Sequence, residues 1–102
     1  MNGATLRTIR EGLGVTAEWL ADFCGVQLRS VQRWEAGDRR VPAGVAEAVE
    51  TLRAQQDSEV AQQLRALRGV PSPRMLASSG WQRAVAFRVI TELPDLVVDD
   101  DD

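Results

Sequence analysis

The sequence has no histidine, no lysine and a single cysteine, Cys24. One cysteine excludes an internal disulfide, and one cysteine without histidine excludes the usual zinc sites. The lack of imidazole also removes the commonest general base. No nucleophile–base arrangement and no phosphate-binding loop is present either. We therefore expect no metal, no cofactor and no enzymatic activity.

Long apolar runs are also missing. No stretch is long enough to span a bilayer, and no basic-then-apolar leader opens the chain, so we expect a soluble, cytoplasmic protein without a membrane partner. The length of 102 residues and the hydrophobic share of 44% suit one globular domain, or a small domain with an appended dimerisation element.

Acidic and basic residues are unevenly distributed along the chain, whose net charge is −3. Residues 1–45 hold six arginines and five acidic residues, whereas residues 46–102 hold six arginines and ten acidic residues. The N-terminal half is therefore the cationic one, which suits contact with nucleic acid. Arginine also suits bidentate contacts to guanine and phosphate, although a GC-rich genome would produce the same preference for arginine.

Residues 16–37 predict two short helices joined by a tight turn. Thr16 can cap the first helix with its hydroxyl, and Gly25 can end it in the left-handed conformation. The inward positions are Leu20, Ala21 and Cys24 in the first helix, and Ser30, Val31 and Trp34 in the second, residues 28–36. The outward positions of the second helix are Leu28, Arg29, Gln32 and Arg33. Arginine and glutamine facing away from the core are typical of a helix that reads the major groove.

The chain resembles the lambda-repressor-like, or XRE, helix-turn-helix family over about residues 3–50. The resemblance is carried by LGVT (13–16), LA (20–21), GV (25–26) and V-x-R-W-E-x-G (31–37). It implies a mainly α fold, a lambda-repressor-like helix-turn-helix bundle, and binding to double-stranded DNA. The alternative is a helical hairpin without a role in DNA binding. The whole layout is similar to small repressors of phage and anti-CRISPR-associated operons.

The resemblance also implies which side chains meet DNA. Base contacts are expected from Leu28, Arg29, Gln32 and Arg33, and phosphate contacts from Thr16, Ala17, Gln27, Arg39 and Arg40. The family often has glutamine at the position of Ala17 and asparagine at that of Ala36, and both bind phosphate. Their loss makes Arg39 and Arg40 more important, although the alternative is that these two are solvated loop charges. Leu28 stands where a polar base contact is common, so it either packs on a thymine methyl or faces nothing.

Two further pairs have alternative interpretations. The resemblance implies that Arg10 and Glu35 form an ion pair between the first helix and the end of the reading helix; otherwise they are two independent solvated charges. Trp19 and Phe23 lie on the outward face of their helix, at i and i+4. Either the C-terminal half of the chain covers them, or they are a contact surface for a partner protein.

The remaining elements follow from periodicity and breaks. Residues 4–11 predict a first helix with Leu6 and Ile9 inward, ended by Gly12 and Gly14. Residues 43–68 predict one long helix whose middle, residues 55–59, has no large apolar residue and is either exposed or kinked. After a break at residues 69–74, residues 80–92 predict a final helix. Residues 96–98 are a short strand candidate.

These elements divide the chain into three parts. We expect a helix-turn-helix domain over residues 1–54, a long-helix extension with a C-terminal dimerisation element over 55–98, and a disordered acidic tail over 99–102. The final helix is apolar on nearly all sides, more than a short chain can cover from within. Dimerisation is therefore expected through Trp81, Val85, Val89 and Leu93.

The expected function is a sequence-specific transcriptional regulator, a repressor acting as a homodimer on an inverted-repeat operator. The second hypothesis is an antitoxin-like interaction module that neutralises a partner protein through surfaces such as Trp19 and Phe23.

Overall fold

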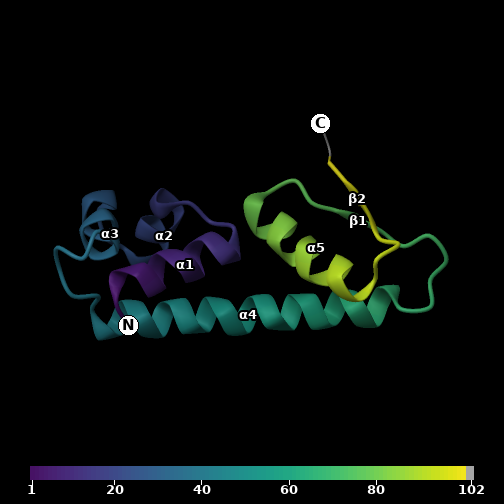
Figure 1. Ribbon diagram of the computed structural model, residues 1–102, viewed down its shortest axis with the longest axis horizontal. Helices are drawn as coiled ribbons and strands as arrows, with labels where there is room; N and C mark the ends of the chain where they lie inside the picture. The colour runs from purple at the N-terminus through teal and green to yellow at the C-terminus, as the bar shows by residue number, and fades with distance from the viewer. Residues whose placement is uncertain (101–102) are drawn as a thin grey trace.

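The long helix α4 runs along most of the molecule, and α1 and α5 pack against it one after the other (Figure 1). The computed structural model describes residues 1–100. Its elements, in chain order, are α1 (Gly3–Leu13), α2 (Ala17–Cys24), α3 (Leu28–Glu35), α4 (Ala43–Leu67), β1 (Arg74–Leu76), α5 (Gly80–Glu92) and β2 (Val97–Asp99). The fold is therefore mainly helical, with the helix-turn-helix at one end and α5 with two short strands at the other. The molecule measures 49 × 26 × 20 Å.

Side-chain caps begin three of the helices. Asn2, Thr16 and Ser79 precede α1, α2 and α5, and each side-chain oxygen accepts a backbone N–H three residues ahead, at 2.8, 3.0 and 3.1 Å. These oxygens satisfy donors that have no partner within the helix. The helix starts are thus set by single residues, which is why the start expected at Thr16 is present.

Glycines in the left-handed conformation end α1 and α2. Gly25 has φ 68° and closes α2, as its position predicts. Gly14 has φ 80° and closes α1, whereas Gly12 lies inside the helix. The first helix therefore continues to Leu13, two residues beyond its expected end, because only one of the two neighbouring glycines adopts the left-handed turn.

Two hydrophobic cores lie side by side along α4. The first contains Leu6, Leu13, Val15, Leu20, Ala21, Val31, Trp34, Val41, Val45, Val49 and Leu52. The second contains Val60, Met75, Ala77, Val85, Ala86, Val89 and Leu96. Because α4 contributes to both cores without interruption, the domain boundary expected between residues 54 and 55 falls inside a continuous helix.

The middle of α4 is neither kinked nor fully exposed, which corrects the expectation for residues 55–59. Gln56 has only 2% of its surface exposed, and its Nε2 donates to the carbonyl oxygen of Leu13 at 3.1 Å. Leu13 is the last residue of α1, where carbonyls lack partners within the helix. The buried amide of Gln56 therefore links α4 to α1, because it donates a hydrogen bond to a carbonyl oxygen at the end of α1.

The C-terminal part contains a strand pair inside one chain. β1 and β2 pair in parallel, with Arg74 opposite Val97, Met75 opposite Val98 and Leu76 opposite Asp99. The expected strand is present one residue later than predicted, and its partner lies next to the stretch expected to be only a break. Asp99 belongs to β2, so the acidic tail does not begin there; residues 101–102 of that tail lie outside the described residues.

The apolar stripe of α5 packs inside its own chain. Val85 and Val89 are only 3% and 0% exposed, and Trp81 and Leu93 pack against the same second core. This corrects the premise that a short chain cannot cover the stripe, because the second half of α4 and the strands cover it. The apolar side chain that α5 leaves in solvent is Phe87, which is 72% exposed.

Candidate nucleic-acid interface

The second helix of the helix-turn-helix, α3, lies at one end of the molecule (Figure 1). A tight turn holds it against α2: the Val26 N–H donates to the Ala21 carbonyl at 2.9 Å. On its inner side, Val31 and Trp34 are 0% and 6% exposed and join the first core. These two anchors fix which face of α3 is directed to solvent.

The outer face of α3 carries the side chains expected to contact bases. Arg29 and Gln32 are exposed, whereas Leu28 and Arg33 are half-buried. All four lie within one eight-residue helix, which is short enough to enter the major groove along most of its length. The predicted reading side chains are thus brought together, with Leu28 partly covered by the chain itself.

The arginines of this surface are unpaired, in contrast to many of those elsewhere. Ion pairs within the chain are formed by Arg7, Arg10, Arg53, Arg68, Arg74 and Arg88. Within residues 1–100, no carboxylate pairs with Arg29, Arg33, Arg39 or Arg40. Arg65 and Arg83 are also unpaired, but they stand apart on α4 and α5. The guanidinium groups of these four arginines, on α3 and in the loop after it, are therefore available to another acceptor.

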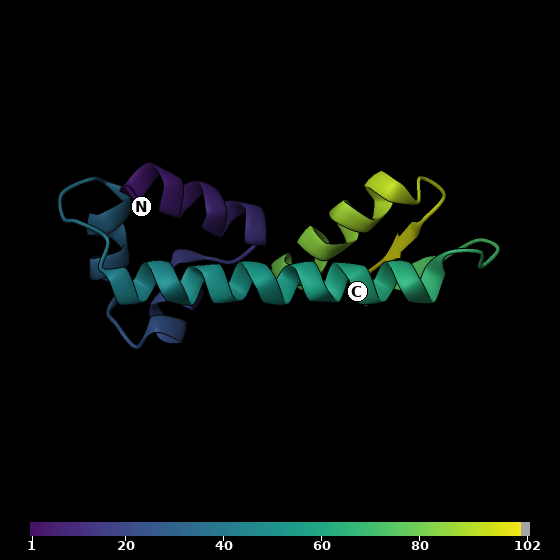
Figure 2. The ribbon, with the colours of Figure 1, turned by 90° about the horizontal axis from the view of Figure 1, so that it is seen from below.

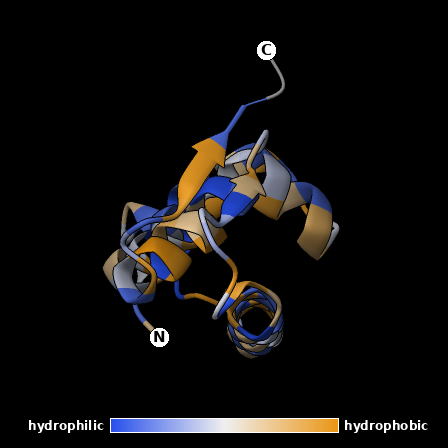
Figure 3. Ribbon diagram, turned by 90° about the vertical axis from the view of Figure 1, so that its right-hand side faces the viewer, coloured by the Kyte–Doolittle hydropathy of each residue, from blue (hydrophilic) through white to orange (hydrophobic). Residues whose placement is uncertain are grey.

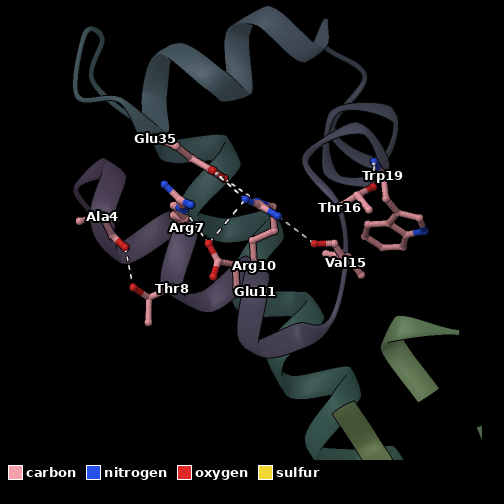
Figure 4. Close-up of polar contacts among 9 residues, drawn as sticks. All are labelled: Ala4, Arg7, Thr8, Arg10, Glu11, Val15, Thr16, Trp19 and Glu35. Atoms are coloured by element: carbon pink, nitrogen blue, oxygen red, sulfur yellow. Dashed lines mark hydrogen bonds and ion pairs between the residues drawn. The ribbon is translucent and has the colours of Figure 1, made fainter. Parts of the chain in front are cut away.

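Arg10 joins α1 to the end of α3 (Figure 4). Its Nε and Nη2 donate to the two carboxylate oxygens of Glu35 at 2.7 and 2.9 Å, and its Nη1 donates to the carbonyl of Val15 at 3.0 Å. The two charged side chains are only 14% and 10% exposed. The hydrogen bond with Glu35 raises the pKa of Arg10 above its ordinary value, against the opposing effect of burial. The predicted pair is present, and it fixes α3 relative to α1.

A close backbone approach at Gly3 supports the same end of α3. A Cβ atom at this position would lie 1.9 Å from the carbonyl oxygen of Trp34. Only glycine allows α1 to start so near the end of α3. Sequence reasoning missed this residue, because a glycine near the chain start gave no indication of what it would touch.

The residues expected to contact phosphate lie at the starts of α2 and α3 and in the loop after α3. Thr16 is exposed, although its hydroxyl oxygen already accepts the Trp19 N–H. Ala17 is half-buried, and only its backbone N–H could donate to a phosphate. Gln27 is exposed and its side chain makes no cap hydrogen bond. Arg39 and Arg40 are both exposed.

The sequence model of the helix-turn-helix domain family matches residues 3–62, which include α1, α2, α3 and most of α4. The chain belongs to the helix-turn-helix domain family. Members are typically DNA-binding regulators rather than enzymes. No curated protein matches the chain significantly.

The aromatic pair on α2 is partly covered by the C-terminal half of the chain. Trp19 stacks on Phe23 with ring centroids 5.4 Å apart, and on Trp81 of α5 at 6.4 Å. Trp19 and Phe23 remain 41% and 46% exposed. Trp81 is held in place because its Nε1 donates to Glu59 at 2.5 Å. The helix-turn-helix domain and the C-terminal part therefore meet through stacked rings as well as through α4.

Two other features of the helix-turn-helix protein concern ligands and membranes. Among residues 1–100, no group of three or more histidine, cysteine, aspartate or glutamate side chains is placed to hold a metal ion. Within the same residues, no helix is both long enough and apolar enough to cross a membrane.

Proposed function

We propose that this chain is a sequence-specific transcriptional repressor that binds an inverted-repeat operator as a homodimer, with α3 in the major groove. One observation carries the proposal. Arg29, Arg33, Arg39 and Arg40 form the cluster of arginines that no carboxylate of the described chain neutralises. Arg29 and Arg33 lie on α3, which Trp34, Val31 and the Arg10–Glu35 pair hold in place, and Arg39 and Arg40 lie in the loop that follows it.

Base recognition falls to the outer face of α3. Arg29 and Arg33 suit bidentate contacts with guanine O6 and N7, and Gln32 suits adenine. Leu28, which is half-buried, presents an apolar edge that suits a thymine methyl. Each good bidentate pair discriminates against a wrong base by about 1–3 kcal/mol, so two arginines provide substantial selectivity in each half-site.

Phosphate contacts position α3 without reading sequence. Arg39 and Arg40 follow α3 directly and reach the backbone beside the groove. Gln27 and Thr16 supply side-chain donors at the starts of α3 and α2, while Ala17 supplies a backbone N–H at a helix N-terminus, which favours an anion. The two arginines carry most of this anchoring, because Ala17 and Ala36 lack polar side chains.

Two copies are needed because one reading helix covers only a half-site. Helix-turn-helix dimers bind half-sites separated by a whole number of DNA turns, and the two-fold axis of the protein matches an inverted repeat. A dimer of this size regulates most simply by occupying a promoter and excluding other proteins, which is the basis for proposing repression.

A binding selection on random DNA duplexes tests this function. We expect it to enrich an inverted repeat with guanine in both half-sites. Recovery of no enriched sequence would overturn sequence-specific binding.

The salt dependence of binding to the enriched duplex tests the anchoring. Arg39→Ala and Arg40→Ala should each reduce the slope of log K against log salt by about 0.9, because each removes one phosphate contact. The matched control is Arg65→Ala, an unpaired and exposed arginine of α4, which should leave the slope unchanged. Equal slopes in all three variants would place Arg39 and Arg40 outside the interface.

A further inference from the structure

The outer edge of β2 carries backbone groups that are unpaired in the chain. Its inner edge is paired with β1: the Val97 N–H donates to the Pro73 carbonyl at 2.9 Å, and the Asp99 carbonyl accepts the Ala77 N–H at 2.8 Å. Because successive residues of a strand direct their backbone groups to opposite edges, the N–H and C=O of Val98 face outward. Within residues 1–100, no hydrogen bond to either group is made.

This edge is open to solvent and apolar. β2 lies on the side of α5 away from α4, in the half of the molecule opposite α3, and leads to the C-terminus (Figures 1 and 3). Val97 and Val98 are both 42% exposed, and Leu76 of β1 is 53% exposed. Edge strands are usually kept short or protected by charge, proline, a bulge or a covering loop. Val97–Asp99 is short, but it contains no proline, and its one charged side chain is paired with Arg74 of β1. Sheets of two short strands are also marginal by themselves.

The edge is self-complementary about a two-fold axis at Val98. Two antiparallel β2 strands centred on this residue place Val98 opposite Val98 of the second copy. Each then donates its N–H to the carbonyl of the other, as in any hydrogen-bonded antiparallel pair. In the same register, Asp99 of one copy lies opposite Val97 of the other, so the acidic side chains do not face one another. Asp99 is also ion-paired with Arg74 in its own chain, at 2.6 Å.

We infer that a second copy of this chain docks on the outer edge of β2, giving a four-stranded sheet in the order β1–β2–β2–β1 across the two-fold axis. The inference deepens the proposed function, since it rests on the homodimer and names the surface that forms it. The stripe Trp81, Val85, Val89 and Leu93 then serves to hold the C-terminal part together within each copy. The dimer contact is made by backbone groups of Val98 and by exposed valines.

Disulfide cross-linking of the full-length protein tests the register. In a Cys24→Ala background, Val98→Cys places two thiols across the axis, where Cα atoms of a hydrogen-bonded pair lie about 5.5 Å apart, within disulfide range. Diamide should convert most of this variant to a covalent dimer at micromolar concentration. Leu76→Cys, at a comparably exposed position of the same sheet, is the control and should form no covalent dimer. Equal cross-linking of both variants, or of neither, would overturn the inference, provided that both reduced thiols react with a maleimide.

A second pair of variants tests the interface without a new thiol. Val98→Pro removes the outward N–H but none of the hydrogen bonds to β1, so it should sediment as a monomer with unchanged circular dichroism. Leu76→Lys should remain a dimer. Val98→Pro should keep the parent affinity for a single half-site. Its affinity for the inverted repeat should fall at least tenfold, because two separate monomers no longer bind the two half-sites as one linked unit.

The two sets of results separate the interface from the function. If Val98→Cys cross-links but the parent binds no duplex selectively, the interface stands and the proposed function fails. If the parent binds DNA selectively while Val98→Pro remains a dimer, the interface is wrong and the function stands.

Discussion

Arg10 holds three segments of the helix-turn-helix domain with one guanidinium. Since the side chains of Arg10 and Glu35 are both nearly buried, removing one leaves the other as a buried charge without its partner. Arg10→Ala or Glu35→Ala should therefore lower the free energy of unfolding by about 3 kcal/mol, measured by urea denaturation. The control is Arg7→Ala, which breaks an exposed pair with Glu11 and should change stability little. Equal effects of the three substitutions would show that the Arg10 pair is no more than a surface contact.

Gln56 makes a different kind of link, from α4 to the end of α1. Gln56→Leu keeps the size of the side chain but leaves the Leu13 carbonyl without its donor, so it should cost about 1–3 kcal/mol of unfolding free energy. Gln55→Leu changes the neighbouring exposed residue and should stay within about 0.5 kcal/mol. Thermal denaturation of both variants is the measurement, and indistinguishable transitions would contradict a structural role for Gln56.

These two residues differ in how far sequence could predict them. Arg10 and Glu35 match a family pattern, so their pairing was expected although 25 positions separate them. Gln56 lies in a stretch without large apolar residues, which indicates solvent exposure by periodicity alone. Its burial depends on where the Leu13 carbonyl lies, and only the packing of α1 on α4 determines that.

The junction between α1 and α5 depends on two glycines. A Cβ atom at Gly80 would lie 2.1 Å from the Gly14 carbonyl oxygen, and one at Gly14 would lie 2.1 Å from that of Gly80. Gly80→Ala should therefore force the helices apart and destabilise the protein by about 1–3 kcal/mol. Gly44→Ala has open space around its Cβ position and should be neutral or slightly stabilising. Equal melting temperatures for the two variants would contradict this close contact.

Element prediction succeeded where the signals were local. Thr16 and Gly25 define α2 by their own backbone preferences, so its limits were correct from sequence. β1 has three residues and no pattern of its own, and it forms only because β2 lies beside it. The final helix was predicted correctly in extent, but an all-round apolar helix does not indicate which side its own chain will cover.

At the scale of the whole molecule, α4 connects the proposed reading surface with the proposed dimer edge. Figure 2 shows α1 and α2 flanking one half of this helix, with α5 beside the other half. The proposed reading surface lies at one end of the molecule and the proposed dimer edge lies in the other half, so the two can be altered independently.

The central claim is that α3 reads bases, and the base preference at each operator position tests it most directly. This preference is measured for the parent, Arg29→Ala and Arg33→Ala on duplexes carrying every single-base change. We expect each variant to fold normally and to lose about 1–3 kcal/mol of discrimination at one base pair, at the equivalent position of both half-sites. Variants that bind more weakly but keep the complete base preference of the parent would contradict it.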